Sequence, residues 1–210
     1  MARVIVCGGS TVYGLHDPEG GGFAGRVKST MMLRAANGIR PCPEVYAFGI
    51  PGRTLPDIVA ALPNYIETYA RGKTIGVFAV GASDHRIGRG ESDPKVPLPA
   101  FRAALGELGE LCAKYTISPV FLGFPRIDDR FTQPFHPTGE NFNDKRLREY
   151  TECVRTFAES SEPPGYFVDM REPFDEAGDF ALTAFDHLHP NHLGHALIAD
   201  RVITVIDDIL

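Results

Sequence analysis

Five short apolar runs recur along the chain, and segments with helical periodicity separate them. The runs are "RVIVCG" (3–8), "EVYAFG" (44–49), "TIGVFAVG" (74–81), "SPVFLGF" (118–124) and "GYFVDM" (165–170). Such runs are typical of strands that are buried on both faces of a parallel sheet. The helical segments lie at 22–36, 54–71, 97–115, 143–160 and 190–209. This alternation predicts an α/β fold, a three-layer α/β/α domain with about five parallel strands, over residues 1–210.

Capping residues predict where two of these helices begin. Thr54 precedes "LPDIVAAL", and Asp57 follows three residues later in the spacing of a capping box. Pro190 is expected as the first residue of the last helix, because its fixed φ suits that position and its missing N–H is not needed there.

Composition narrows the class of protein. The chain has 210 residues, a net charge of −6 and a pI near 5.6, with no block of Lys or Arg. A general nucleic-acid binder would need a basic face, so no nucleic-acid partner is expected. No stretch reaches the length of a membrane span, and no secretory signal is recognisable. The four scattered cysteines are expected to be reduced thiols, and the expected compartment is the cytoplasm.

Polar, glycine-bearing segments follow the first three strands: "GGSTVYG", "GIPGRT" and "GASDHR". Ligands of parallel sheets bind outside the carboxyl ends of the strands, so all three segments are expected to line one site. Two longer stretches, 84–97 and 124–143, are expected as insertions at the same edge. The second carries Phe131, Phe135 and Phe142, which predicts a lid or a pocket wall.

The stretch "FDHLHPNHLGHALIAD" (185–200) holds four of the seven histidines. Asp186 lies three residues before His189. In a turn, this spacing lets the carboxylate reach Nδ1 and leaves Nε2 free to accept a proton from a hydroxyl group. The alternative is an acidic residue near a helix N-terminus beside an incidental surface histidine. Ser10 could likewise be only a cap in a glycine-rich turn.

A metal site is a further alternative for the histidine-rich stretch. His187, His189, His192 and His195 are conceivable ligands, but their spacing matches no zinc pattern and no second cluster of thiols or carboxylates accompanies them. The glycines near Ser10 form neither a P-loop nor a dinucleotide-binding motif. No metal and no cofactor are therefore predicted. His192 and His195 are expected on a polar helix face.

Taken together and in this order, the motifs resemble those of the SGNH/GDSL hydrolase superfamily along nearly the whole chain. "CGGSTVYG" is similar to the first block of that superfamily and "DHLHPNHLG" to the fifth. The resemblance implies a flavodoxin-like sheet, with Ser10 as nucleophile, His189 as general base and Asp186 as the orienting acid. "FGIPGRT" is similar to the second block, which implies that the backbone N–H of Gly52 contributes to the oxyanion hole.

The sequence departs from that pattern at two positions. Gly9 stands where the superfamily has the aspartate of G-D-S, and Ser83 stands where its oxyanion-hole asparagine is expected. In other hydrolases, a side-chain amide donor is worth about 10²–10³ in turnover. A serine hydroxyl also donates, but its reach is shorter. Ser83 is therefore expected as a third donor that acts directly or through a water molecule, and replacement by another group is the alternative.

The expected function is that of a serine esterase that cleaves a small ester through an acyl-enzyme. Short acyl esters, including O-acetyl groups on sugars, are substrates that the resemblance implies. Two alternatives stay open: acyl transfer to an alcohol on the same scaffold, and a non-catalytic ligand-binding domain, which Gly9 and Ser83 would favour.

Overall fold

The computed structural model describes residues 2–70, 72–162, 164–178 and 180–210. Within them, one parallel sheet has the strand order β2-β1-β3-β4-β5, the order of flavodoxin-like folds. The strands are β1 (Arg3–Gly8), β2 (Glu44–Gly49), β3 (Thr74–Ala79), β4 (Ile117–Leu122) and β5 (Tyr166–Val168). The predicted fold class is confirmed.

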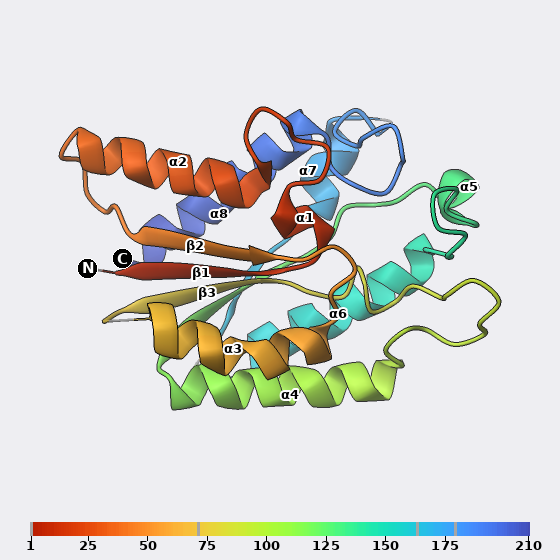
Figure 1. Cartoon of the computed structure of the whole chain (residues 1–210), viewed down its shortest axis with the longest axis horizontal. Helices are drawn as coiled ribbons and strands as arrows, with labels where there is room; N and C mark the ends of the chain where they lie inside the picture. The colour runs from red at the N-terminus through yellow and green to blue at the C-terminus, as the bar shows by residue number, and fades with distance from the viewer. Residues whose placement is uncertain (1, 71, 163, 179) are drawn as a thin grey trace.

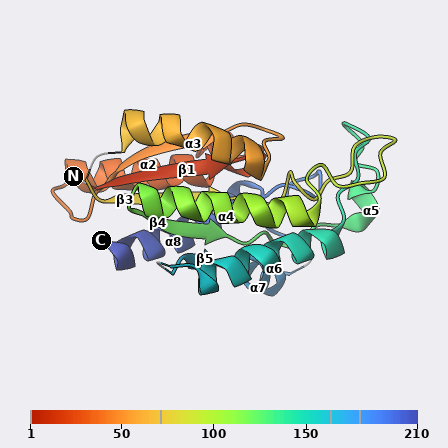
Figure 2. The same ribbon diagram turned by 90° about the horizontal axis from the view of Figure 1, so that it is seen from below.

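Helices cover both faces of this sheet (Figures 1 and 2). One face is covered by α2 (Gly22–Ala36) and α8 (His192–Ile209), which pack on each other. The opposite face is covered by α3 (Leu55–Tyr69), α4 (Leu98–Lys114) and α6 (Asp144–Ser160). Three short helices lie outside these layers: α1 (Ser10–Tyr13), α5 (Asp129–Thr132) and α7 (Arg171–Glu176). No helix within the described ranges is long and apolar enough to cross a membrane.

The central strands are buried on both faces, as their continuous apolar runs predict. In β1, Val4 and Val6 pack toward α2 and α8, whereas Ile5 and Cys7 pack toward α3 and α4. Each side chain of this size contributes about 1.5–3 kcal/mol by leaving water. All four cysteines are free thiols, and burial raises the pKa of Cys7 to about 12.

One of the two predicted helix starts is correct and the other is wrong. Thr54 and Asp57 form the expected capping box at α3. The predicted end of that helix at residue 71 lies outside the described residues. Pro190 is not the first residue of α8, because Asn191 caps this helix and its Oδ1 accepts the N–H groups of Leu193 and Gly194, both at 3.0 Å.

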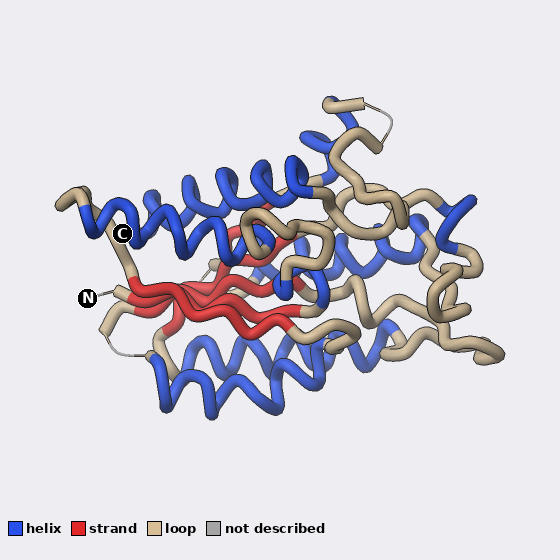
Figure 3. Tube along the Cα trace, turned by 45° about the horizontal axis from the view of Figure 1, so that its top comes forward, coloured by secondary structure: helices blue, strands red, loops and turns tan. Residues whose placement is uncertain are grey.

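The strand register brings the loops that follow β1, β2 and β3 to the same edge of the sheet. Gly8 pairs with Gly49 on one side and with Ala79 on the other, so β1, β2 and β3 end together. Figure 3 shows the loops gathered at this end of the sheet, while both termini lie at the other. Gly49 is required here, because a Cβ atom would lie 2.2 Å from the backbone nitrogen of Tyr13 in α1.

The two insertions contact each other across this end of the molecule. Ile87 and Asn141 pair as an isolated antiparallel bridge, with N–H···O distances of 3.0 and 2.9 Å. Arg146 at the start of α6 donates from Nε to the carbonyl of His85 at 2.6 Å. The insertions therefore form one continuous wall beside the ends of the strands.

Candidate active site

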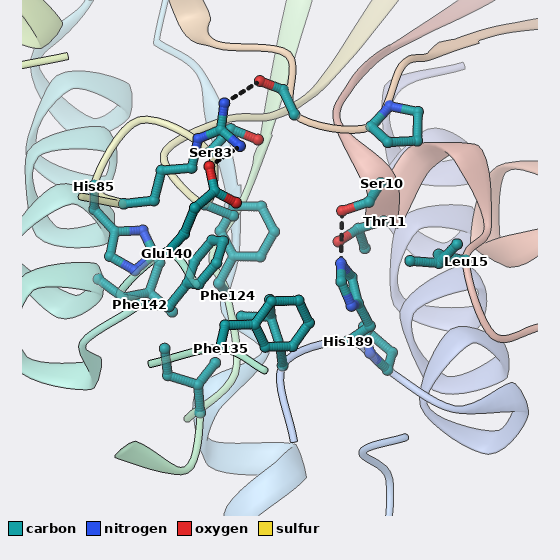
Figure 4. A pocket seen from close by; sticks show the side chains of 18 of the residues that line it. Ser10, Thr11, Leu15, Ser83, His85, Phe124, Phe135, Glu140, Phe142 and His189 are labelled. Atoms are coloured by element: carbon teal, nitrogen blue, oxygen red, sulfur yellow. Dashed lines mark hydrogen bonds and ion pairs between the residues drawn. The ribbon is translucent and has the colours of Figure 1, made fainter. Parts of the chain in front are cut away.

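Ser10 lies where β1 gives way to α1, directly after the glycine pair. It is the first residue of the short helix, and its Oγ is 2.7 Å from Nε2 of His189 (Figure 4). The two residues are 179 positions apart in the sequence. The buried β1 strand and the turn before α8 bring them together.

Asp186 and His189 have the hydrogen-bond geometry expected from their spacing. Nδ1 of His189 is 2.6 Å from Oδ2 of Asp186, and Oδ1 accepts the N–H groups of Leu188 and His189 at 3.0 Å each. Burial acts to raise the pKa of this carboxyl, but its hydrogen bonds outweigh burial and lower the pKa well below the usual range. An ionised Asp186 favours the tautomer with the proton on Nδ1, which leaves Nε2 of His189 as an acceptor for Ser10.

A second histidine, His16, contacts the same carboxylate, and no motif in the sequence pointed to it. Nε2 of His16 is 2.9 Å from Oδ2 of Asp186, and the ring packs edge-on against Phe185 with centroids 5.0 Å apart. His16 has φ = +66°, a conformation that is uncommon for a residue other than glycine. Its side chain is 25% exposed, so solvent reaches part of the ring, whereas the Asp186 side chain is only 5% exposed.

Buried polar residues hold the loop that carries His16 on both sides. His195 donates from Nε2 to the carbonyl of Leu15 at 3.1 Å and accepts the N–H of Phe23 at 3.1 Å. Asp17 is buried and accepts the guanidinium of Arg26 through both oxygens. The expectation that His195 lies on a polar helix face is therefore wrong, because its side chain is fully buried and is used to anchor this loop.

Gly52 and Ser83 line the same cavity as Ser10. Gly52 has φ = +79°, which glycine adopts without strain. In the part of the chain that the structure describes, neither the N–H of Ser10 nor that of Gly52 has a hydrogen-bond acceptor. Both residues line the cavity beside the Ser10 hydroxyl.

The two departures from the superfamily pattern lie next to each other. A Cβ atom at position 9 would lie only 3.1 Å from Oγ of Ser83. Such an approach is tight, so a side chain at position 9 would press on the Ser83 hydroxyl. Glycine at position 9 leaves space on that side of Ser83.

The cavity beside Ser10 has a volume of about 280 Å³ and a mostly apolar lining. Ser10 and His189 form one wall, and aromatic side chains from the second insertion lie opposite them (Figure 4). The apolar lining includes Leu15, Ala82, Phe124, Ile127, Phe135, Phe142, Leu147 and Leu188, together with Pro51, Pro125 and Pro190. Phe131 does not line this cavity; it is half-exposed and stacks on His187 at 3.9 Å. Two of the three phenylalanines that the sequence singled out thus form the wall.

An ion pair closes the polar end of the cavity. Arg86 from the first insertion contacts Glu140 from the second, with Nη1 2.9 Å from Oε1. The same guanidinium lies 3.4 Å from the carbonyl oxygen of Gly52. The pair therefore connects both insertions to the turn that carries the Gly52 N–H.

Two buried titratable residues lie behind Ser83. Asp84 accepts the N–H groups of Leu55 at 2.7 Å and of Gly81 at 3.0 Å, and so connects the β3 loop to the start of α3. Burial raises the pKa of Asp84 to about 6 against the effect of these bonds, and burial lowers the pKa of His85 to about 4.

The four-histidine metal site considered from the sequence is not formed. Within the described residues, His187, His192 and His195 belong to no group of three metal-ligand side chains whose ligand atoms lie close together. His187 stacks on Phe131, His192 is exposed at the start of α8, and His195 is buried under the loop of His16.

Comparisons with known proteins agree with this fold. The sequence matches the GDSL-like lipase/acylhydrolase family over residues 6–197. No protein of curated function matches it. A lipase/acylhydrolase from Enterococcus faecalis is similar in structure, with 18% identity, a TM-score of 0.73, and coverage of 100% of this chain and 97% of the other. An acetyl xylan esterase, Axe2-W215I from Geobacillus stearothermophilus, has 20% identity, a TM-score of 0.68, and coverage of 97% and 93%. Another acetyl xylan esterase, AlAXEase, has 17% identity, a TM-score of 0.70, and coverage of 97% and 99%.

Proposed function

The chain belongs to the GDSL-like lipase/acylhydrolase family and is an ester-cleaving serine hydrolase, and from this premise we propose that Ser10, His189 and Asp186 carry out its reaction. Oγ of Ser10 attacks the ester carbonyl while Nε2 of His189 takes the hydroxyl proton. Asp186 stabilises the imidazolium that forms. His189 then passes the proton to the departing alcohol, and a water molecule hydrolyses the acyl-enzyme by the same steps.

The observation that carries this proposal is the continuous hydrogen-bonded chain from Ser10 to Asp186. The distances of 2.7 Å and 2.6 Å lie within hydrogen-bond reach at both junctions. The ionised Asp186 supports the tautomer in which His189 acts as a base toward Ser10. Ser10 and His189, at one end of this series of hydrogen bonds, line an apolar cavity large enough for part of a substrate.

The carbonyl oxygen becomes negatively charged in the tetrahedral intermediate and needs hydrogen-bond donors around it. We assign the N–H groups of Ser10 and Gly52 to this role, with the hydroxyl of Ser83 as a third donor. Ser10 is also the first residue of α1, where backbone N–H groups point out of the helix.

We propose small esters with an apolar acyl group or an aromatic group as substrates. The aromatic and aliphatic wall favours such a group, because burying it removes apolar surface from water. We further propose that residues 1–210 act as one catalytic domain, since the family match spans residues 6–197 and the cavity is lined by residues from Ser10 to Pro190.

Labelling with a fluorophosphonate tests the reactive serine directly. We expect one adduct on the wild-type protein by intact mass, no adduct on Ser10→Ala, and slower labelling of His189→Ala. Ser92→Ala, in the exposed part of the first insertion, serves as the control and should label like wild type. Absence of an adduct on folded wild-type protein would contradict the proposal and favour a non-catalytic binding domain.

Substitution of Ser83 measures the third donor. Ser83→Ala should lower kcat by about 10- to 100-fold with little change in KM, because the donor acts mainly on the charged transition state. Ser83→Asn should raise kcat, since Gly9 leaves space beside position 83 and an amide reaches further than a hydroxyl. Steady-state hydrolysis of p-nitrophenyl butyrate gives both constants. A folded Ser83→Asn protein without activity would exclude this role.

A further inference from the structure

We propose that His16, Asp186 and His189 form a Zn²⁺ site that overlaps the acid and base of the triad and reversibly inhibits the enzyme. Within the described part of the chain, this is the one group of three His, Cys, Asp or Glu side chains whose ligand atoms all lie within 4.8 Å of one another. It unites residues separated by 170 positions in the sequence.

The donor set selects the metal. Two imidazoles and one carboxylate suit Zn²⁺, whereas Mg²⁺ and Ca²⁺ prefer sets made of oxygen. Oδ2 of Asp186 lies 2.6 Å from Nδ1 of His189 and 2.9 Å from Nε2 of His16. With metal–ligand distances of about 2.0–2.2 Å, tetrahedral ligands stand about 3.4 Å apart. Each nitrogen therefore needs to move away from Oδ2 by less than about 1 Å, and the ligand atoms of the two histidines, which lie within 4.8 Å of each other, need to come to the same separation.

The position of His16 is built rather than incidental. Its backbone is held at φ = +66°, and anchored residues lie on both sides of it: the carbonyl of Leu15 is bound by the buried His195, and Asp17 is bound by Arg26. The His16 side chain is 25% exposed, so solvent meets one edge of its ring, next to the Asp186 side chain, which is 5% exposed. The fourth zinc ligand would be a water molecule at that edge.

Zinc binding would stop catalysis because it changes which ring nitrogen of His189 carries the proton. Each imidazole donates one lone pair and Asp186 donates a carboxylate lone pair, so nothing is oxidised or reduced. The proton on Nδ1 of His189 moves through solvent to Nε2 of the same ring, and the proton on Nε2 of His16 moves to Nδ1. His189 then presents an N–H to Ser10 and has no lone pair for the serine proton.

This inhibition rests on the proposed function, but zinc binding itself does not, so both are measured. Isothermal titration calorimetry with ZnCl₂ uses chelator-treated Ser10→Ala protein, in which the three ligands are intact. We expect one zinc ion per chain. Hydrolysis of p-nitrophenyl butyrate by the wild-type enzyme should fall over the same zinc concentrations and recover on addition of EDTA. MgCl₂ at the same concentrations should have no effect.

His16→Gln is the decisive variant, because glutamine can still donate a hydrogen bond to Asp186 but cannot replace the imidazole ligand. We expect it to weaken both zinc binding and zinc inhibition by more than about 10-fold. Loss of a residue that only hydrogen-bonds to a metal ligand already costs about 10-fold in affinity, and His16 would be a ligand itself. His192→Ala removes an exposed histidine outside the site and should behave like wild type.

The outcomes separate the two proposals. Zinc binding that is equal in wild type and His16→Gln, or equally strong Mg²⁺ binding, overturns the metal site. An active enzyme without calorimetric zinc binding overturns it as well and leaves the proposed function intact. Zinc binding that depends on His16 in a protein without esterase activity supports the metal site and contradicts the function.

Discussion

Replacing His189 by alanine is expected to lower kcat for a small ester by about 10⁴- to 10⁶-fold, with KM changed only a few-fold. Without the imidazole, Ser10 attacks as a neutral hydroxyl, and the departing alcohol has no proton donor. The hydrogen bond of 2.7 Å between Oγ and Nε2 is the structural basis of this expectation. Binding of the apolar part of the substrate depends on the cavity wall and is retained.

The effects of Ser10 and His189 should not add. Removal of either one already abolishes the attack, so the double variant Ser10→Ala/His189→Ala should be no slower than the slower single variant. Residual hydrolysis then reports the oxyanion donors and the cavity alone. His192→Ala is the matched control on α8. An additive loss in the double variant would mean that the two residues act in separate steps, which contradicts the proposed triad. Circular dichroism on each variant establishes that the fold is kept.

The second large effect concerns the pH dependence of stability. The pKa of Asp84 is raised from 3.8 to about 6 in the folded protein, so the folded state binds more protons than the unfolded state between these values. Its contribution to the free energy of unfolding therefore falls as pH rises through this window, by about 3 kcal/mol in total. Burial is the main cause, and the neighbouring Asp57 adds to the shift.

His85 acts in the opposite direction over almost the same range. Its pKa is lowered from 6.5 to about 4, chiefly by burial and also by the charge of Arg146. The unfolded state then binds more protons, so the contribution of His85 to stability rises by about 3 kcal/mol from pH 4 to 6.5. The two contributions largely cancel in the wild-type protein.

Single substitutions should reveal each contribution separately. The stability of Asp84→Asn relative to wild type should increase from pH 4 to pH 6, whereas that of His85→Phe should decrease from pH 4 to pH 6.5. Urea unfolding at several pH values measures both differences. The loss of one hydrogen bond from a backbone N–H to Asp84 lowers the free energy of unfolding of the variant by the same amount at every pH. It therefore does not alter how the stability difference changes with pH. Parallel pH profiles for wild type and Asp84→Asn would contradict the raised pKa of this carboxyl.

Much of the fold could be predicted from the sequence, because the signals concerned are local. Buried parallel strands have continuous apolar runs, and all five predicted strands are present with similar bounds. The Asp186–His189 contact was predictable for the same reason, since three residues of one turn set its geometry. The start of α8 was misjudged because two capping signals competed, and the side chain of Asn191 prevailed over the fixed φ of Pro190.

The contacts that the sequence did not reveal join distant segments. His16 has no neighbouring motif, and its approach to Asp186 depends on the loop held by His195. The ion pair of Arg86 and Glu140 depends on how the two insertions pair. The histidine at position 195 was expected on a polar helix face, but the start of α2 and the loop that carries His16 bury it. These features depend on tertiary packing, for which local periodicity carries no signal.

The wall made by the two insertions can diverge during evolution while the reacting groups stay in place. Ser10 depends on β1, and His189 depends on the turn before α8, whereas the wall depends on the pairing of Ile87 with Asn141. The proposed substrate wall and the proposed triad thus depend on separate parts of the chain. Because each insertion supports the other, a lineage that acquires a new ester must change both together. For the same reason, an engineer who transplants specificity from a relative should move the pair as one module.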